Sequence, residues 1–244
     1  MGFQAEHGGE TALPVPLIEK KALAGQIFDL LETRIISGEL NPGSSLVEED
    51  MATEFGFSRS PVREAIARLE RTMLVERVGP RLRRVVVPTP KFISDIYDTW
   101  VVIEVGRCYS SCVNSPASDG RRIEKLLRDM ALSLKQRDIP RHVELSASFH
   151  DLLVDRCNNK YLAELHRDCQ KYVQWFGNIY FGKVDISANS LREHGEIARH
   201  YIDKDFLGLA DAVQRHIRRQ KNEVLAILMR SDTDIVSRGT NQGA

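Results

Sequence analysis

The chain has 244 residues with 34 basic and 34 acidic side chains, so its formal net charge is zero. Hydrophobic residues make up 42% and charged residues 28%, which is ordinary for a soluble globular protein. No apolar run approaches the roughly 18–20 residues of a membrane span, and the N-terminal stretch has no signal-peptide core. We therefore expect a cytoplasmic protein with no membrane partner.

The first domain is predicted over residues 17–89, after a flexible arm at 1–16. Apolar residues at helical spacing predict three helices, over 17–38, 47–55 and about 60–72. Two strands are then expected at 74–78 and 83–87, around a loop at 79–81 that contains Gly and Pro. This element order is typical of a winged helix-turn-helix.

The third helix has two unlike faces. Its apolar face, which we expect to pack on the preceding helices, consists of Val62, Ala65, Ile66 and Leu69. Ser60 is a favourable N-cap, and Pro61 suits the first helical turn. Arg59 and Arg63 lie at the same end, where the helix dipole and free amide groups favour anions. Polar and cationic groups therefore gather at the start of this helix.

The zero net charge hides a local asymmetry. Residues 17–58 carry three basic and eight acidic side chains, a net of −5, whereas residues 59–84 carry eight arginines and three glutamates, a net of +5. A basic block of this kind predicts a polyanionic partner. We interpret the third helix as a reader of the DNA major groove, where arginine can bond two guanine acceptors. The alternative is a surface helix with ordinary charges.

The second domain is predicted to be entirely helical. The sequence PTP at 88–90 forms a stiff boundary, and residues 91–230 show no strand alternation. Six helices are expected, near 91–113, 119–136, 140–156, 160–180, 187–203 and 206–230. Residues 231–244 are polar and read as a disordered tail. The fold class is therefore mainly α, with a three-helix winged helix-turn-helix and two-stranded wing followed by an all-α antiparallel bundle.

The segment SGELNPGSSLVEEDMATEFGFSRSPVREAIARLERTMLV, residues 37–75, resembles the GntR family of bacterial transcription regulators. The resemblance implies a homodimeric repressor or activator that binds a short palindromic operator in double-stranded DNA, and of the two we predict a repressor. On matching positions it implies that DNA is contacted by Ser58, Arg59, Ser60 and Arg63, with Arg81 at the wing tip.

Two positions depart from that family pattern. Glu49 stands where some relatives carry a base-reading arginine. Leu82 stands where the wing normally has a glycine, so Arg83 and Arg84 are expected to supply phosphate contacts.

Residues 91–230 resemble the FCD domain found in FadR-like members of the GntR family. That domain often holds a divalent metal through an aspartate and three histidines, and the matching histidines here are His150, His194 and His216. Helical spacing places all three on inward faces, and imidazole suits Zn or Ni. The alternative is three histidines that only fill the core.

The aspartate position of that motif is occupied by Ser146, four residues before His150. Trp100 stands where relatives usually carry an arginine. We expect an effector pocket beside the histidines that is lined by Ser146, Trp100, Tyr172 and Trp175. Each aromatic residue could instead be an ordinary core residue.

The leading hypothesis is a DNA-binding regulator, not an enzyme, that responds to a small effector, expected to be an organic acid. One alternative is a metal sensor in which the cation itself is the effector. A hydrolase with a three-histidine metal site has no well-placed general base. A purely structural DNA-binding protein would not need a polar cluster inside the bundle.

Overall fold

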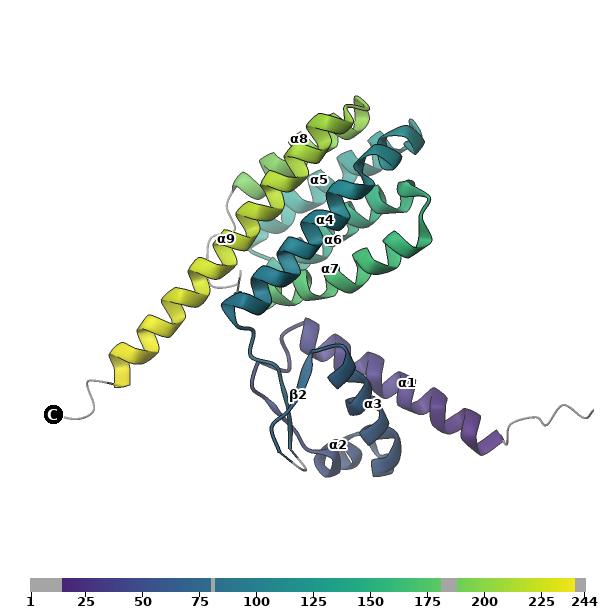
Figure 1. The fold of residues 1–244 in the computed structure, drawn as a ribbon, viewed down its shortest axis with the longest axis vertical. Helices are drawn as coiled ribbons and strands as arrows, with labels where there is room; N and C mark the ends of the chain where they lie inside the picture. Colours follow the sequence, from purple (N-terminus) through teal and green to yellow (C-terminus); the bar gives the residue numbers. More distant parts are fainter. Residues whose placement is uncertain (1–14, 80–81, 181–187, 240–244) are drawn as a thin grey trace, which may run out of the picture. The chain divides into compact units, whose positions relative to one another are not determined.

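We analysed a computed structural model, which describes residues 15–79, 82–180 and 188–239. The chain forms two compact units, and each is described by itself. The described residues are mainly helical, as predicted, with one small sheet in the N-terminal unit (Figure 1).

The N-terminal unit is a winged helix-turn-helix. Its helices are α1 (Val15–Ile36), α2 (Glu48–Phe55) and α3 (Arg59–Arg71). The apolar face predicted for α3 is buried, and it packs in a common core with residues such as Leu31 of α1 and Met51 of α2. Gly56 ends α2 in the left-handed conformation at φ 70°, which glycine adopts without strain, and so turns the chain into α3.

The wing is a sheet of three strands rather than the two predicted. Its strands are β1 (Ser45–Leu46), β2 (Val75–Arg77) and β3 (Arg83–Val85), in the antiparallel order β1-β3-β2. β1 has only two residues, too few to produce a recognisable alternation in the sequence. The wing tip predicted at Arg81 lies outside the described residues.

The N-cap predicted for the third helix was placed two residues too late. Ser58, in extended conformation, is the N-cap of α3, whereas Ser60 is already helical. Pro61 still falls within the first turn, where its missing N–H costs no helical hydrogen bond.

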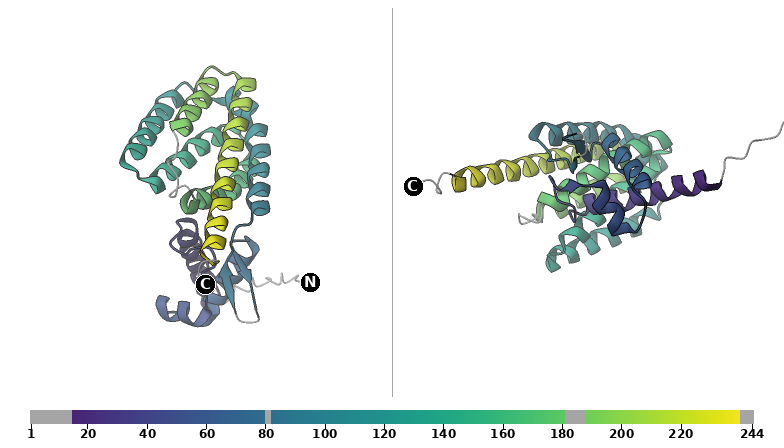
Figure 2. Two further views of the ribbon diagram at one scale, coloured as in Figure 1. Left: turned by 90° about the vertical axis from the view of Figure 1, so that its left-hand side faces the viewer. Right: turned by 90° about the horizontal axis from the view of Figure 1, so that it is seen from below.

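The C-terminal unit is an antiparallel helical bundle (Figures 1 and 2). Its elements are α4 (Pro90–Asn114), α5 (Asp119–Gln136), α6 (Ile139–Val154), the short 3-10 helix η1 (Asp155–Cys157), α7 (Lys160–Tyr180), α8 (Ala188–Ile202) and α9 (Phe206–Gly239). The long helices α4 and α9 lie side by side in both views of Figure 2. The helix α9 continues to Gly239, past the predicted end at 230, because no glycine or proline interrupts residues 231–238.

Candidate metal centre and DNA interface

Three histidines from three helices converge in the core of the bundle. His150 on α6, His194 on α8 and His216 on α9 each offer a ring nitrogen, and these atoms all lie within 4.8 Å of one another. No side chain of the three is more than 1% exposed. The structure therefore brings together the residues that the sequence predicted as metal ligands.

Hydrogen bonds behind the cluster fix how each imidazole faces. Nδ1 of His150 donates to Glu104 Oε2 at 2.8 Å, and Nδ1 of His216 donates to Glu193 Oε2 at 2.8 Å. Nδ1 of His194 donates to the carbonyl oxygen of Ser190 at 2.8 Å. With Nδ1 protonated, each Nε2 is left with a lone pair, the form that binds a metal.

The Nε2 atoms of the three histidines have few hydrogen-bond partners. Within the described residues, Nε2 of His150 and of His216 is buried without a hydrogen-bond partner. Nε2 of His194 accepts from the hydroxyl of Ser146 at 3.1 Å. Ser146 therefore sits where the family's aspartate would add a negative charge, and it brings a neutral oxygen there instead.

The histidines are held neutral. Burial lowers the pKa of His194 well below its usual range, and the neighbouring His216 and His150 lower it further. Burial also lowers the pKa of His216 to about 4, although the hydrogen bond to Glu193 opposes this shift. Since a metal must compete with protons for the ring nitrogen, neutral imidazoles favour metal binding at physiological pH.

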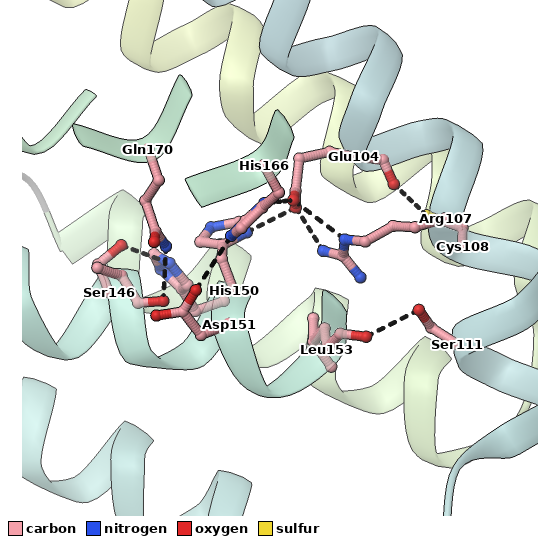
Figure 3. A network of polar contacts seen from close by, with 12 residues as sticks. Glu104, Arg107, Cys108, Ser111, Ser146, His150, Asp151, Leu153, His166 and Gln170 are labelled. Atoms are coloured by element: carbon pink, nitrogen blue, oxygen red, sulfur yellow. Dashed lines mark hydrogen bonds and ion pairs between the residues drawn. The ribbon is translucent and has the colours of Figure 1, made fainter. Parts of the chain in front are cut away.

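Glu104 links the histidine cluster to two further buried polar residues, Arg107 and His166 (Figure 3). Its carboxylate is fully buried and forms an ion pair with Arg107, whose Nε donates to Oε1 at 3.0 Å. Nδ1 of His166 lies 2.7 Å from the same oxygen, and its Nε2 lies 3.3 Å from Asp151. Burial would raise the pKa of Glu104, but Arg107 and His150 outweigh burial and hold that pKa well below normal. The carboxylate is thus charged and keeps His150 in its metal-binding tautomer.

A cavity opens beside the cluster. It encloses about 520 Å³ not filled by protein atoms, part of it open to solvent. His150, Trp100 and Ser146 line it, as do Val143, Ala147, Val173, His142, Gln170, Gln174, Gly177, Ser190, Arg219, Gln220 and Glu223. It joins apolar walls with a few polar groups, as small-molecule sites do.

Two of the predicted pocket residues lie elsewhere. The residues of α7 that line the cavity follow one helical stripe, at positions 170, 173, 174 and 177. Tyr172 lies off this stripe and packs edge-on against Phe92, with 5.9 Å between ring centroids. Trp175 is fully buried and stacks on Phe176. Trp175 therefore fills the core, the alternative left open by the sequence, whereas Tyr172 is half-buried outside the cavity lining.

Sequence reasoning missed the charged groups around the cavity. Arg219 follows His216 by three residues, so helical spacing places both on one face of α9. Its Nε donates to Glu193 at 2.7 Å, and its Nη1 pairs with Glu223 at 2.5 Å. The available signal for Glu104 was its i, i+3 spacing to Arg107 within the otherwise apolar stretch of residues 100–108.

The start of α3 presents the residues expected to contact DNA. Ser58, Arg59, Ser60 and Arg63 are all exposed. The two arginines of this set are already paired with acidic residues of α2. Arg59 forms an ion pair with Glu49, and Nε of Arg63 donates to Glu48 at 2.9 Å. The Glu49 side chain, noted in the sequence as a departure, therefore lies directly beside the candidate DNA-reading surface.

The arginines of β3 are engaged within the unit. Arg83 is only 15% exposed and pairs with Glu70 of α3 at 2.5 Å, which fits a structural pair better than a phosphate contact. Arg84 pairs with Glu76 at 2.7 Å and is 43% exposed. Of the two, Arg84 is the more accessible to a phosphate.

Each of the two units matches a known protein family. Residues 23–81 match the model of bacterial regulatory proteins of the gntR family, and residues 95–219 match the FCD domain. The gluconate operon transcriptional repressor of Bacillus licheniformis is 32% identical over 151 residues, which is 60% of this chain and 60% of the repressor's length. The regulator BphR of Paraburkholderia xenovorans is 24% identical over 92% of this chain and 89% of its own length.

Solved structures share the fold at low sequence identity. Escherichia coli McbR/YncC has a TM-score of 0.72 at 17% identity, over 83% of this chain and 96% of that chain. A GntR transcriptional regulator of Rhodococcus sp. RHA1 has a TM-score of 0.73 at 20% identity, over 84% of this chain and 98% of that chain. These families and relatives are transcriptional regulators rather than enzymes. The chain belongs to the gntR family of bacterial regulatory proteins, as a member with an FCD domain.

Proposed function

We propose that this protein is a homodimeric transcriptional repressor that binds a palindromic DNA operator in the cytoplasm and responds to an organic acid in the FCD cavity. The observation that carries the proposal is the pairing of two sites in one chain. One is an exposed cluster of arginine and serine at the start of α3, and the other is a buried three-histidine cluster that borders a cavity. Among the described residues no helix could cross a bilayer.

The first site suits the major groove. A helix start with exposed Arg59 and Arg63 can bond guanine edges, and the serine hydroxyls can hold phosphates. A dimer would place two such helices on half-sites about one helical turn apart.

An exposed apolar stripe on α4 supports dimer formation. Val102 is 72%, Tyr109 60% and Val113 58% exposed, and they recur at i, i+7 and i+11 along one face. Gly106 lies between them, and a Cβ added there would enter open space. Such a stripe is costly to leave in water, and a second copy of the chain would cover it with the same residues.

The second site fits a divalent transition metal. The orphaned buried Nε2 atoms of His150 and His216, together with His194, form a donor set that suits Zn or Ni. When bound, such an ion would supply positive charge and open coordination positions beside the cavity. Glu104 and Glu193 would hold two of the imidazoles in place from behind.

Charge balance supports an acidic effector in the presence of that metal. The imidazoles are neutral, and Arg219 is paired with two carboxylates, Glu193 and Glu223, so these groups sum to −1. A divalent cation changes this sum to +1, which favours a carboxylate. The effector would act by binding two arrangements of the dimer with different affinity.

Selection of bound sequences from random duplex DNA tests the proposal, followed by fluorescence anisotropy on the selected site. We expect a palindrome with two half-sites, and an affinity that an organic acid changes in metal-loaded protein. Binding that depends only on duplex length and salt, with no selected sequence, would refute an operator-binding role.

A metal-sensing regulator is the second candidate. It is favoured by the absence of a carboxylate from the histidine cluster within the described residues, because binding would then be weaker and more responsive to metal concentration. In that case DNA affinity would follow the concentration of Zn or Ni with no organic acid present.

A further inference from the structure

Three acidic residues form the first turn of α2, and they differ in how far they are exposed. They are Glu48, Glu49 and Asp50, at a position where the helix dipole favours negative charge. The side chain of Glu48 is only 20% exposed and accepts a hydrogen bond from Nε of Arg63 at 2.9 Å. The side chain of Glu49 is 64% exposed and pairs with Arg59, which is 57% exposed. Glu48 is therefore largely covered by the protein, whereas Glu49 and Arg59 remain open to a partner at the start of α3.

The pair of Glu49 and Arg59 leaves atoms of both side chains available to a base. Nη2 of Arg59 donates to Oε1 of Glu49, so Nε and Nη1 of the arginine and Oε2 of the glutamate take no part in this bond. A guanidinium carries five N–H donors, and two of them are enough to bond O6 and N7 of a guanine. Because the carboxylate stays bonded to one side of the guanidinium, it reaches the base edges together with Arg59.

The chemistry of a carboxylate determines which base it can bond in the major groove. An ionised carboxylate only accepts hydrogen bonds, so the acceptors N7 and O6 of guanine and O4 of thymine repel it. Adenine offers the donor N6, but its acceptor N7 lies beside that donor. Cytosine presents its 4-amino group in this groove and no acceptor of its own. A carboxylate held next to Arg59 therefore favours cytosine over the other three bases.

We propose that Glu49 accepts a hydrogen bond from the 4-amino group of an operator cytosine, at or directly beside the base pair that Arg59 reads. This inference rests on the proposed operator-binding role and deepens it. Glu49 is then a residue that determines specificity. Its charge also repels the phosphates, so its contribution is to selectivity rather than to affinity. Removing the carboxylate should therefore raise the affinity for sites that lack the cytosine and reduce the difference between sites.

A cytosine analogue tests this contact with the full-length protein. The base 2-pyrimidinone lacks the 4-amino group but leaves the opposite guanine in place, so it removes what Glu49 would bond and keeps what Arg59 would bond. The probes are duplexes of the selected operator in which each cytosine of a half-site is replaced in turn by this analogue. Fluorescence anisotropy at fixed salt gives the affinities. We expect one replacement in each half-site to weaken binding of the wild type by about tenfold.

Variants then assign the effect to Glu49. Glu49→Ala should bind the operator and the analogue duplex equally well, because it has no carboxylate to lose a partner. Asp50→Ala removes a carboxylate from the next, exposed residue of α2 and should be weakened by the analogue as much as the wild type. Glu49→Arg should select guanine in place of the cytosine, because arginine bonds O6 and N7 of guanine.

The outcomes separate this contact from the operator-binding role. Equal effects of the analogue on the wild type and on Glu49→Ala at every cytosine would overturn the contact and leave an operator-binding repressor standing. An unchanged base preference in Glu49→Arg would also overturn it. If the wild type selects no DNA sequence at all, the operator-binding role fails, and the contact fails with it.

Discussion

Oε2 of Glu193 on α8 accepts a hydrogen bond from Nδ1 of His216 on α9 at 2.8 Å. The same carboxylate accepts from Nε of Arg219, one helical turn further along α9. Burial would raise the pKa of Glu193, but the hydrogen bonds from His216 and Arg219 outweigh it and keep the carboxyl group charged. One side chain therefore orients a candidate metal ligand and also holds a candidate effector-binding group.

Glu193→Gln should weaken metal binding by about 10–100-fold, because the charged partner of His216 makes that imidazole a better ligand. Competition with a chromophoric chelator measures the affinity. Glu196→Gln is the matched control, since Glu196 lies on the same helix and pairs with Arg215 at the surface. Equal metal affinity in wild type and Glu193→Gln would remove Glu193 from the site.

Arg63→Ala should weaken binding to the selected operator by about 1–3 kcal/mol and relax the base preference at the position that Arg63 reads. Fluorescence anisotropy at fixed salt gives the affinity. The control is Arg218→Ala, which removes an exposed arginine from α9 in the other unit. If the two variants bind the operator equally well, Arg63 makes no specific contact.

Glu49→Gln should strengthen DNA binding by a few-fold. The ion pair with Glu49 must be broken or shared when Arg59 approaches the bases, and exposed pairs of this kind stabilise by about 0.2–1 kcal/mol. The control is Asp50→Asn, which removes the same charge from the next residue of α2. It shows whether the gain comes from freeing Arg59 or from the change in net charge. Equal gains in the two variants would attribute the effect to net charge alone.

The charged side chain of Asp119 should stabilise the bundle at neutral pH, and this stabilisation should be lost in acid. The side chain is 1% exposed and accepts from Arg156 at 2.7 and 2.8 Å and from Tyr201 at 2.7 Å. Burial would raise the pKa of Asp119, but these hydrogen bonds outweigh it and hold the pKa below 3.8. The stabilisation is therefore fully present at pH values above the ordinary aspartate pKa. It is lost as the pH falls through the lower pKa that Asp119 has in the folded state.

Asp119→Asn should accordingly lower the free energy of unfolding by about 1–3 kcal/mol at pH 7. The difference from wild type should shrink as pH falls from 5 toward 3. Urea denaturation at each pH measures the free energy of unfolding of both proteins. The control is Asp203→Asn, which changes an exposed aspartate. A difference that stays constant across this range would show that the Asp119 charge does not contribute.

The sequence predicted those features of the fold that depend on the spacing of residues within one helix or one motif. Helical periodicity was enough to find the bundle helices, and a long motif was enough to identify the start of α3. The three histidines were found because they match the metal motif of the FCD domain, and helical spacing placed each of them on an inward face. Features that depend on tertiary packing were missed. Arg219 and Glu193 meet only when α8 and α9 pack together, so neither helix alone indicates the pair.

The errors have similar physical causes. Tyr172 and Trp175 could not be placed because α7 buries residues on more than one face, and aromatic residues fit the core as well as a pocket. Ser58 and Ser60 are both suitable N-caps, and only the backbone conformation distinguishes them.

The most direct test of the account is the metal content of untagged protein purified without chelator, measured by elemental mass spectrometry in wild type and in His194→Ala. The account predicts about one Zn or Ni ion per chain in the wild type and a loss of most of it in the variant. A folded wild type without metal, or equal metal content in the two proteins, would contradict a metal centre at His150, His194 and His216.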